Sequence, residues 1–366
     1  MALDDYDRLA GAVIVGGFDG LVAPSELLSR IADGRLAGVT IFKRNIESPL
    51  QLARLVDGLV SAARTGSQAP PLVSIDQEGG RVARLRAPLV ELPPMRRFGE
   101  YDDGSLTRRA LALLGAQLAA LGCTTDFAPV ADVDSNPANP VIGDRSFSRD
   151  PHKCATHVVA AIEGLRSSGV LACAKHFPGH GDTELDSHLA LPVLRHDRAR
   201  IDAIELPPFR AAIAAGVASV MTAHVVFEGV EKDLPATLSK KIVTDLLRRE
   251  LGFAGVCFSD DLHMKAVADR YGIADSAVRS IEAGCDALLV CTDIDSHELA
   301  RLALAARART DAAFADRLSE AGGRLRAMRQ SAPPAPITDA ATLDAVWRSA
   351  DAVALSAELR ARAEKS

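Results

Sequence analysis

An apolar run near the middle of the chain ends in a lysine and a histidine and opens into a loop rich in titratable groups. The run spans residues 170–174, and Lys175 and His176 follow it directly. The proline and glycines that come next break any helix, so the pattern predicts a strand that delivers both side chains to its end. Further along, the loop carries Asp186 and His188, whose side chains can move a proton or hold a metal ion.

Two further segments carry carboxylates directly after apolar runs. Asp76 lies in the first segment, residues 75–81, and Asp260 lies in the second, residues 257–262. A carboxylate at a strand end, paired with an acid/base group on a loop, is the arrangement of a retaining glycosidase. In this interpretation Asp260 is the nucleophile. An aspartate at a strand end can also simply cap the next helix, and Asp261 fits that role.

Composition and charge indicate an ordinary globular protein. The chain has 366 residues, of which 48% are hydrophobic and 25% charged, and its formal net charge is −6. Nucleic-acid binding needs clustered positive charge, which the sequence lacks. No apolar run approaches the roughly 20 residues that span a bilayer, and the acidic N-terminus is unlike a secretion signal. We therefore expect a cytoplasmic monomer without nucleic-acid or membrane partners.

The sequence contexts of the six cysteines and of several histidines predict whether each side chain is buried or exposed. The cysteines are scattered without paired spacing, mostly in apolar runs, so we expect reduced core residues. A further group of histidines lies in charged, helical or loop contexts and is expected at the surface: His152, His157, His196, His263 and His297.

One structural unit recurs along the chain: a helical run closed by glycine, then a short apolar run that ends in polar residues. Glycine just past the last helical turn is the left-handed helix cap. Apolar strands without alternation are typical of a parallel sheet buried on both faces. With three earlier runs, the unit gives eight strand candidates, which begin at Ala12, Gly38, Pro71, Thr124, Val170, Ser219, Gly255 and Ala287.

Eight such units favour a (β/α)8 TIM-type barrel over an open doubly wound sheet. No Gly-x-Gly-x-x-Gly motif follows a strand, so the pattern does not support a dinucleotide-binding fold. A barrel places its chemistry at the carboxyl ends of its strands. The polar residues predicted at those ends are Asp76, Asp126, Lys175, His176, His224 and Asp260.

The C-terminal part of the chain is expected to add a helical extension to the barrel. We assign residues 1–330 to the barrel and residues 331–366 to the extension. The extension begins with a stiff proline-rich connector, residues 331–336. After the connector we expect one or two helices that contain Trp347, pack on the outside of the barrel and take no part in the chemistry.

Two interpretations besides a glycosidase stay open on these residues. One is a metal-dependent barrel hydrolase, whose ligands would be His176, His180, His188, His224 and Asp260. The residues between His176 and His180 prevent the helix that would place both rings on one face, so the spacing is unfavourable for a metal site. The other is a non-catalytic sugar-binding protein, in which the polar residues only cap strands.

Six motifs taken together resemble a known family. In content and order they resemble the β-N-acetylhexosaminidases of glycoside hydrolase family 3, in particular the bacterial branch that acts in cell-wall recycling. The resemblance covers roughly residues 10–300 and implies a single barrel, without the second sandwich domain of many family 3 β-glucosidases. The motifs are Ile75–Arg84, Arg145–Phe147, Lys175–Thr183, Asp186–His188, Met221–His224 and Phe258–Leu262.

The resemblance implies a role for the motif residues. Asp260 would be the nucleophile that forms a covalent glycosyl intermediate, and His188, oriented by Asp186, would be the acid/base. The implied activity is removal of terminal N-acetylglucosamine from muropeptide fragments, in which it is β-1,4-linked to anhydro-N-acetylmuramic acid, with or without peptide. No metal or cofactor is implied. The terminal sugar would be held by Asp76, Arg84, Arg145, Lys175 and His176, with His224 near by.

The chemistry of the side chains agrees with these implied roles. The leaving oxygen needs a proton while the nucleophile stays ionised, so the two groups must have separated pKa values. A loop histidine, with an ordinary pKa of about 6.5, meets the first need near neutral pH. The sequence departs from the family pattern at Ser148, where glycine is common, and at His263, where serine or aspartate is common.

Overall fold

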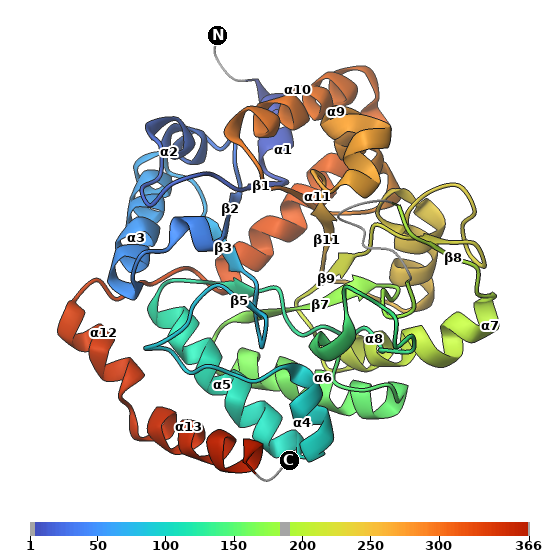
Figure 1. Cartoon of the computed structure of the whole chain (residues 1–366). Coiled ribbons are helices and arrows are strands. Elements are labelled where there is room, and N and C mark those ends of the chain that lie inside the picture. Colours follow the sequence, from blue (N-terminus) through green and yellow to red (C-terminus); the bar gives the residue numbers. More distant parts are fainter. Residues whose placement is uncertain (1–3, 184–190, 365–366) are drawn as a thin grey trace.

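The structure is a computed structural model that describes residues 4–183 and 191–364, and it shows a barrel surrounded by helices (Figure 1). Within these residues, eight parallel strands close the barrel, and each of them lies at one of the candidate positions. The predicted (β/α)8 fold is therefore confirmed. In pairing order the strands are β1 (Ile14–Gly16), β12 (Ala287–Val290), β11 (Val256–Asp261), β9 (Ser219–Thr222), β7 (Leu171–Phe177), β6 (Thr125–Asp126), β3 (Leu72–Ile75) and β2 (Gly38–Ile41).

Helices cover the outside of the barrel (Figure 1). Those between the strands are α2 (Ser25–Ala32), α3 (Pro49–Thr65), α5 (Gly104–Ala120), α6 (Pro151–Ser167), α8 (Leu206–Ala214), η5 (Lys241–Glu250) and α9 (Lys265–Ala283). Others described at the N-terminus and in the connections are α1 (Asp5–Gly11), η1 (Lys43–Asn45), α4 (Met95–Tyr101), η2 (Gly143–Arg145), α7 (Arg198–Arg200), η3 (Ile201–Glu205) and η4 (Ala236–Leu238).

The glycines that close the predicted helices do what the pattern indicated. Each adopts the left-handed region, with a positive φ that a side chain would strain. This turn ends the helix and returns the chain to the barrel for the next strand. The φ angles are 82° at Gly122, 82° at Gly169, 73° at Gly216, 70° at Gly252 and 120° at Gly284.

The barrel interior is filled by side chains from several strands and closed at one end by a helix. Val15, Phe127 and Phe258 are buried in one cluster inside the barrel. Leu325 and Met328 of α11 (Ala312–Ser331) pack into the same cluster. Because the interior is closed from that side, the chemistry is left to the opposite end, where the strands finish.

The C-terminal helices lie along the outside of the barrel, next to α5 (Figure 1). After α10 (Ile294–Thr310) and α11, they are α12 (Ala340–Trp347) and α13 (Ala350–Ala363). Ion pairs hold α13 in place, with Arg109 bonded to Glu358 and Arg362 to Asp103, both at 2.9 Å. The expected helical extension is therefore present on the barrel exterior.

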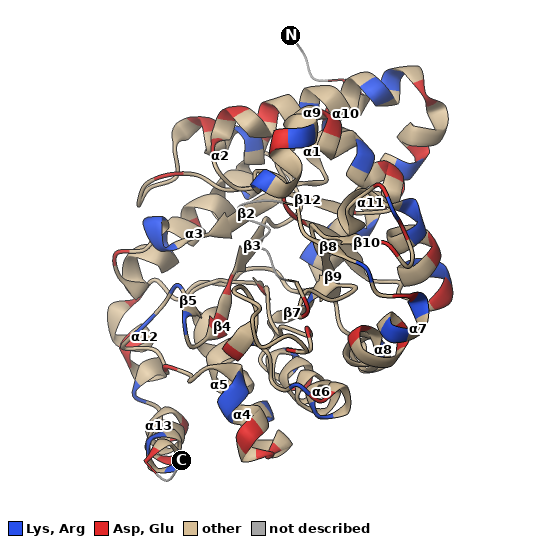
Figure 2. Cartoon of the chain, turned by 45° about the vertical axis from the view of Figure 1, so that its right-hand side comes forward, with Lys and Arg blue, Asp and Glu red and all other residues tan. Residues whose placement is uncertain are grey.

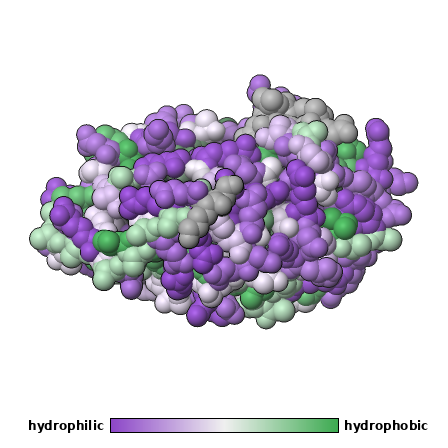
Figure 3. All heavy atoms as spheres, turned by 60° about the horizontal axis from the view of Figure 1, so that its bottom comes forward, coloured by the Kyte–Doolittle hydropathy of each residue, from purple (hydrophilic) through white to green (hydrophobic). Residues whose placement is uncertain are grey.

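The outer surface mixes both signs of charge. Basic and acidic residues are interspersed on the outer helices (Figure 2). The face that carries α13 is predominantly hydrophilic, with small separate hydrophobic areas (Figure 3). Across residues 4–183 and 191–364, none of the helices combines the length and the apolar character that crossing a bilayer requires.

The cysteines are buried as expected, but the prediction for the histidines is partly wrong. All six cysteines are buried. His157 and His297, expected at the surface, are each only 1% exposed. His157 sits on the inner face of α6, where its Nδ1 lies 2.8 Å from the hydroxyl of Thr107 and its ring stacks on Phe147. The charged neighbours in sequence point outward, and they do not report on the inner face of the same helix.

Candidate active site

A cavity of about 360 Å³ lies where the barrel strands end. It is of the size that takes a single small ligand. The side chains come from separate elements: strands β7 and β11, the loop after β3, the turn η2, and the short hairpin of β4 (Gln77–Gly79) and β5 (Val82–Ala83). The predicted residues that line it are Asp76, Arg84, Arg145, Lys175, His176 and Asp260.

Irregular strand ends bring neighbouring residues to the same cavity. In a regular strand, successive side chains point to opposite faces, yet Lys175 and His176 both line the cavity, as do Asp260 and Asp261. The pairing of β7 with β9 shifts register after Lys175, and that of β11 with β12 shifts before Asp261. Bulges of this kind re-aim side chains, and both lie at the residues predicted to do chemistry.

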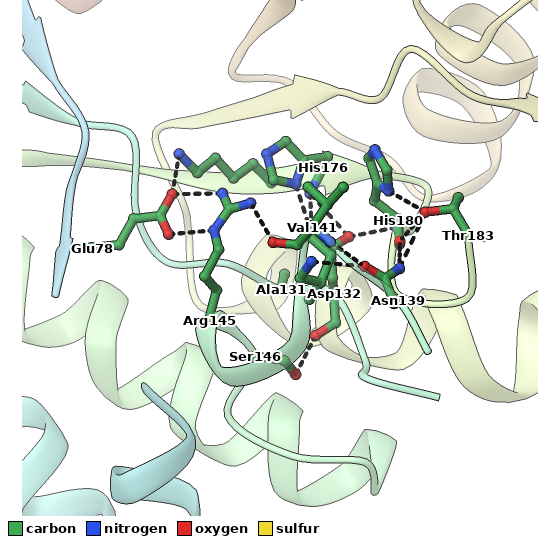
Figure 4. A network of polar contacts seen from close by, with 12 residues as sticks. Glu78, Ala131, Asp132, Asn139, Val141, Arg145, Ser146, His176, His180 and Thr183 are labelled. Atoms are coloured by element: carbon green, nitrogen blue, oxygen red, sulfur yellow. Dashed lines mark hydrogen bonds and ion pairs between the residues drawn. The ribbon is translucent and has the colours of Figure 1, made fainter. Parts of the chain in front are cut away.

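A network of ion pairs forms one wall of the cavity, and Figure 4 shows its part around Glu78 and Arg145. Glu78 accepts two hydrogen bonds from Arg145, from Nε and Nη2, both at 2.8 Å. Lys175 Nζ lies 2.6 Å from Glu78 and 2.8 Å from Asp76. Arg84 Nη2 completes the chain 3.1 Å from Asp76. Three cations thus surround two carboxylates, and the wall offers many donors to a polar ligand.

The charges in this network hold one another ionised. Burial alone would raise the pKa of Glu78, but Arg145 and Lys175 outweigh it, and the pKa lies well below its ordinary value. The pKa of Asp76 is lowered in the same way against its burial, by Lys175 and Arg84. Burial would lower the pKa of Lys175, but Asp76 and Glu78 raise it. The wall is therefore fully charged at neutral pH.

Asp126, predicted at the end of β6, supports the hairpin instead of lining the cavity. It accepts a hydrogen bond from the backbone N–H of Gln77 at 2.9 Å. The side-chain amide oxygen of Gln77 in turn accepts hydrogen bonds from the backbone N–H groups of Arg84 and Leu85, at 2.8 and 3.0 Å. These bonds fix the backbone on both sides of the hairpin, and thereby the positions of Glu78 and Arg84.

His176 and His180 are fixed by buried polar partners. His176 Nδ1 lies 2.7 Å from the carboxylate of Asp132. His180 lines the cavity, and its Nδ1 lies 2.8 Å from the hydroxyl of Thr183. Burial lowers the pKa of His180 to about 4, so its ring is neutral at pH 7. The amide of Asn139 reaches the carbonyl of His180 at 2.8 Å and fixes the turn beneath these rings.

His224, predicted near the sugar, lies behind the cavity wall. It is fully buried, and its ring bonds to Thr237 Oγ1 at 2.8 Å and to the backbone carbonyl of Asp261 at 3.0 Å. Burial lowers its pKa, although the charge of Asp260 opposes this shift. With both ring nitrogens bonded to protein, His224 braces the strand end that carries Asp260.

Two predicted catalytic residues, Asp186 and His188, lie outside the described residues. The described segment that precedes them in the sequence ends with Asp182 and Thr183. His196 pairs with the carboxylate of Asp182. Within residues 4–183 and 191–364, no group of three or more His, Cys, Asp or Glu side chains is placed to hold a metal ion.

Sequence reasoning assigned no role to Glu78 or Asp132, although both are central in the structure. Glu78 was part of a recognised motif, and its position two residues after Asp76 was a usable signal. Asp132 lies six residues beyond the end of β6, and nothing local marks it. Its partner His176 is 44 residues away in sequence, so only folding reveals the pair.

The comparison with known sequences now decides the family. Residues 20–317 match the family described as "Glycosyl hydrolase family 3 N terminal domain". A protein named beta-hexosaminidase from Nitrosomonas eutropha is 40% identical over 268 residues, which cover 71% of this chain and 75% of that protein. One of the same name from Neisseria meningitidis serogroup C is 40% identical over 277 residues, covering 74% and 75%. The chain belongs to glycoside hydrolase family 3.

Solved structures of related proteins share the barrel of this family 3 chain. A family 3 β-N-acetylglucosaminidase from Paenibacillus sp. str. FPU-7 has a TM-score of 0.91 at 37% identity, covering 99% of this chain and 69% of that one. NagZ from Neisseria gonorrhoeae has a TM-score of 0.80 at 32% identity, covering 96% and 97%. The family 3 chain is thus a glycoside hydrolase, and its cavity is the candidate active site.

Proposed function

We propose that the protein is a retaining exo-β-N-acetylglucosaminidase that removes terminal N-acetylglucosamine from muropeptide fragments. The observation that carries the proposal is the placement of Asp260 in one small cavity with the charged wall of Asp76, Arg84, Arg145 and Lys175. The names of the relatives support the class of sugar. One related structure is NagZ from Neisseria gonorrhoeae in complex with N-trifluoroacetyl-D-glucosamine, with a TM-score of 0.77 at 31% identity.

In the proposed mechanism, Asp260 attacks the anomeric carbon while an acid protonates the leaving oxygen. The bond from the anomeric carbon to the leaving sugar breaks as the bond to Asp260 forms, which gives a covalent glycosyl-aspartate. Water then attacks the same carbon and releases Asp260, so the product keeps the β configuration. His188, oriented by Asp186, is proposed as the acid in the first step and the base in the second.

The charged wall would bind the hydroxyl and N-acetyl groups of the terminal sugar. Carboxylates accept hydrogen bonds from sugar hydroxyls, and the guanidinium and ammonium groups donate to their oxygens. Because the ion pairs in the wall are already formed, little reorganisation is needed when the sugar arrives. The wall then fixes the ring above Asp260, with the leaving group toward the cavity mouth.

An Asp260→Asn variant tests the nucleophile. It should lose turnover of an aryl β-N-acetylglucosaminide by about 10³-fold or more, because the amide cannot form the intermediate. A 2-fluoro sugar should label Asp260 in the wild-type protein, as read by peptide mass spectrometry. An Asp269→Asn variant on the exposed side of α9 serves as control. Labelling of another residue, or a product of inverted configuration, would reject the mechanism.

The acid/base and the natural substrate are tested separately. His188→Ala should lose far more activity on poor leaving groups than on activated aryl glycosides, since only the former need a proton. Equal losses would indicate a structural role. We also propose that the enzyme acts as a cytoplasmic monomer in cell-wall recycling. Release of N-acetylglucosamine from its disaccharide with anhydro-N-acetylmuramic acid supports this role, and its absence with full aryl-glycosidase activity contradicts it.

A further inference from the structure

We propose that Asp132 is a positioning residue that holds His176 in the tautomer protonated on Nδ1, so that Nε2 is the atom presented to the sugar. This inference rests on the proposed function, because it takes His176 as a sugar ligand. Asp132 itself does not line the cavity and contacts no substrate. It acts through His176 and through the turn that follows β7.

The carboxylate of Asp132 collects hydrogen bonds from both ends of one short turn (Figure 4). At one end, His176 Nδ1 lies 2.7 Å from Oδ2, and the backbone N–H of His176 reaches both oxygens at 3.2 and 3.3 Å. At the other end, the backbone N–H of His180 donates to Oδ1 at 2.6 Å. One side chain therefore fixes the ring of His176 and the backbone four residues along.

The charge of Asp132 decides which nitrogen of His176 carries the proton. Burial of this fully buried carboxyl would raise its pKa, but His176 and the hydrogen bonds to the turn lower the pKa below its ordinary value. An ionised carboxylate only accepts hydrogen bonds. Nδ1 of His176 must therefore donate, and in a neutral ring Nε2 is left as an acceptor for a sugar hydroxyl.

Asp132 is itself held by the segments that carry other cavity residues. The hydroxyl of Ser146, next to Arg145, donates to the carbonyl of Asp132 at 2.6 Å. The N–H of Ala131 donates to the carbonyl of Lys175 at 2.7 Å. The position of the carboxylate is thus set by the backbone around Arg145 and Lys175, and the orientation of His176 follows from both.

Nuclear magnetic resonance of the imidazole nitrogens tests the inference directly. In 15N-histidine-labelled protein, the signals of His176 are assigned by their loss in His176→Ala. We expect a ring protonated on Nδ1 in the wild type. Asp132→Asn should reverse the pattern, because the amide N–H donates to Nδ1 and leaves the proton on Nε2. Wild-type protein protonated on Nε2 alone would overturn the proposal, even if the variant does not fold.

A double-mutant cycle tests whether Asp132 acts through His176. Asp132→Asn should lower kcat/KM by about ten- to a hundredfold, the range expected for one misdirected hydrogen bond to a charged group, and should have little effect in the His176→Ala background. Equal losses in both backgrounds would show a structural role and overturn the proposal. Asp134→Asn is the matched control, since that buried carboxylate pairs with Arg96 and Arg149.

The two hypotheses fail in different ways. If the wild type hydrolyses no N-acetylhexosaminide, the proposed function fails, but the tautomer of His176 is still read by resonance. If the wild type is active and its His176 carries the proton on Nε2 alone, the proposed function stands and the role of Asp132 falls.

Discussion

Replacing Glu78 by glutamine removes the charge on which the cavity wall is built. Within the described part of the chain, three charge-assisted hydrogen bonds converge on it, two from Arg145 at 2.8 Å and one from Lys175 at 2.6 Å. Each such bond contributes about 1.5–3 kcal/mol. The loss of stability is smaller than the sum of the three bonds, because Lys175 keeps its ion pair with Asp76 and the glutamine amide keeps one acceptor oxygen. Removing one partner of a buried ion pair costs about 3–5 kcal/mol, which is the expected loss of unfolding free energy.

The pH dependence gives this prediction a second readout. The pKa of Glu78 in the folded protein lies below its ordinary value of 4.5, so its contribution is fully present above about that pH. It is lost as the pH falls through the folded pKa. The gap in unfolding free energy between wild type and Glu78→Gln should therefore be constant from pH 8 to about 5 and narrow below. Urea unfolding followed by circular dichroism measures it.

Activity should fall together with stability, because Arg145 and Lys175 lose their fixed positions. A misplacement of about 1 Å costs about a hundredfold in rate, so kcat/KM should drop by at least that factor in protein that is still folded. Glu100→Gln is the control, since its pair with Arg97 is exposed and should change stability by about 0.5 kcal/mol or less. A fully active Glu78→Gln protein whose unfolding free energy lies within about 1 kcal/mol of the wild-type value would refute the reasoning.

Four further substitutions concern regions outside the cavity. Asp286→Asn should cost about 3–5 kcal/mol in urea unfolding without changing KM, because Asp286 precedes β12 at the opposite end of the barrel and is bonded there by Arg248, Arg317 and Arg324. Gly58→Ala, with open space around an added Cβ, should raise stability by about 0.5–1 kcal/mol. Gly16→Ala, whose Cβ would lie 2.2 Å from the ring of His297, should lower the stability by about 1–3 kcal/mol. A stabilising Gly16→Ala together with a destabilising Gly58→Ala would contradict the packing. Burial raises the pKa of Glu205 to about 7, so wild-type stability should decline as the pH rises from about 5 to 8, and Glu205→Gln should show a smaller decline in the same unfolding series.

The sequence by itself determined the barrel, because the signals that specify it are local. A glycine in the left-handed region closes five of the helices that precede a strand, and an apolar run marks each buried strand, so neither needs a distant partner to be recognised. Once the barrel was predicted, its topology carried Asp76, Lys175 and Asp260 to one end. These three residues line the cavity.

The tertiary structure alone decided how those residues are paired. Glu78 meets Arg145 across 67 residues of sequence, and Asp132 meets His176 across 44. The shifts of register that turn both Asp260 and Asp261 into the cavity depend on how β11 pairs with β12. Such contacts arise from the packing of distant segments, whose geometry no local pattern contains. The sequence therefore determined the barrel and the strand-end residues Asp76, Lys175 and Asp260, and the fold decided which further side chains join them and how all of them are paired.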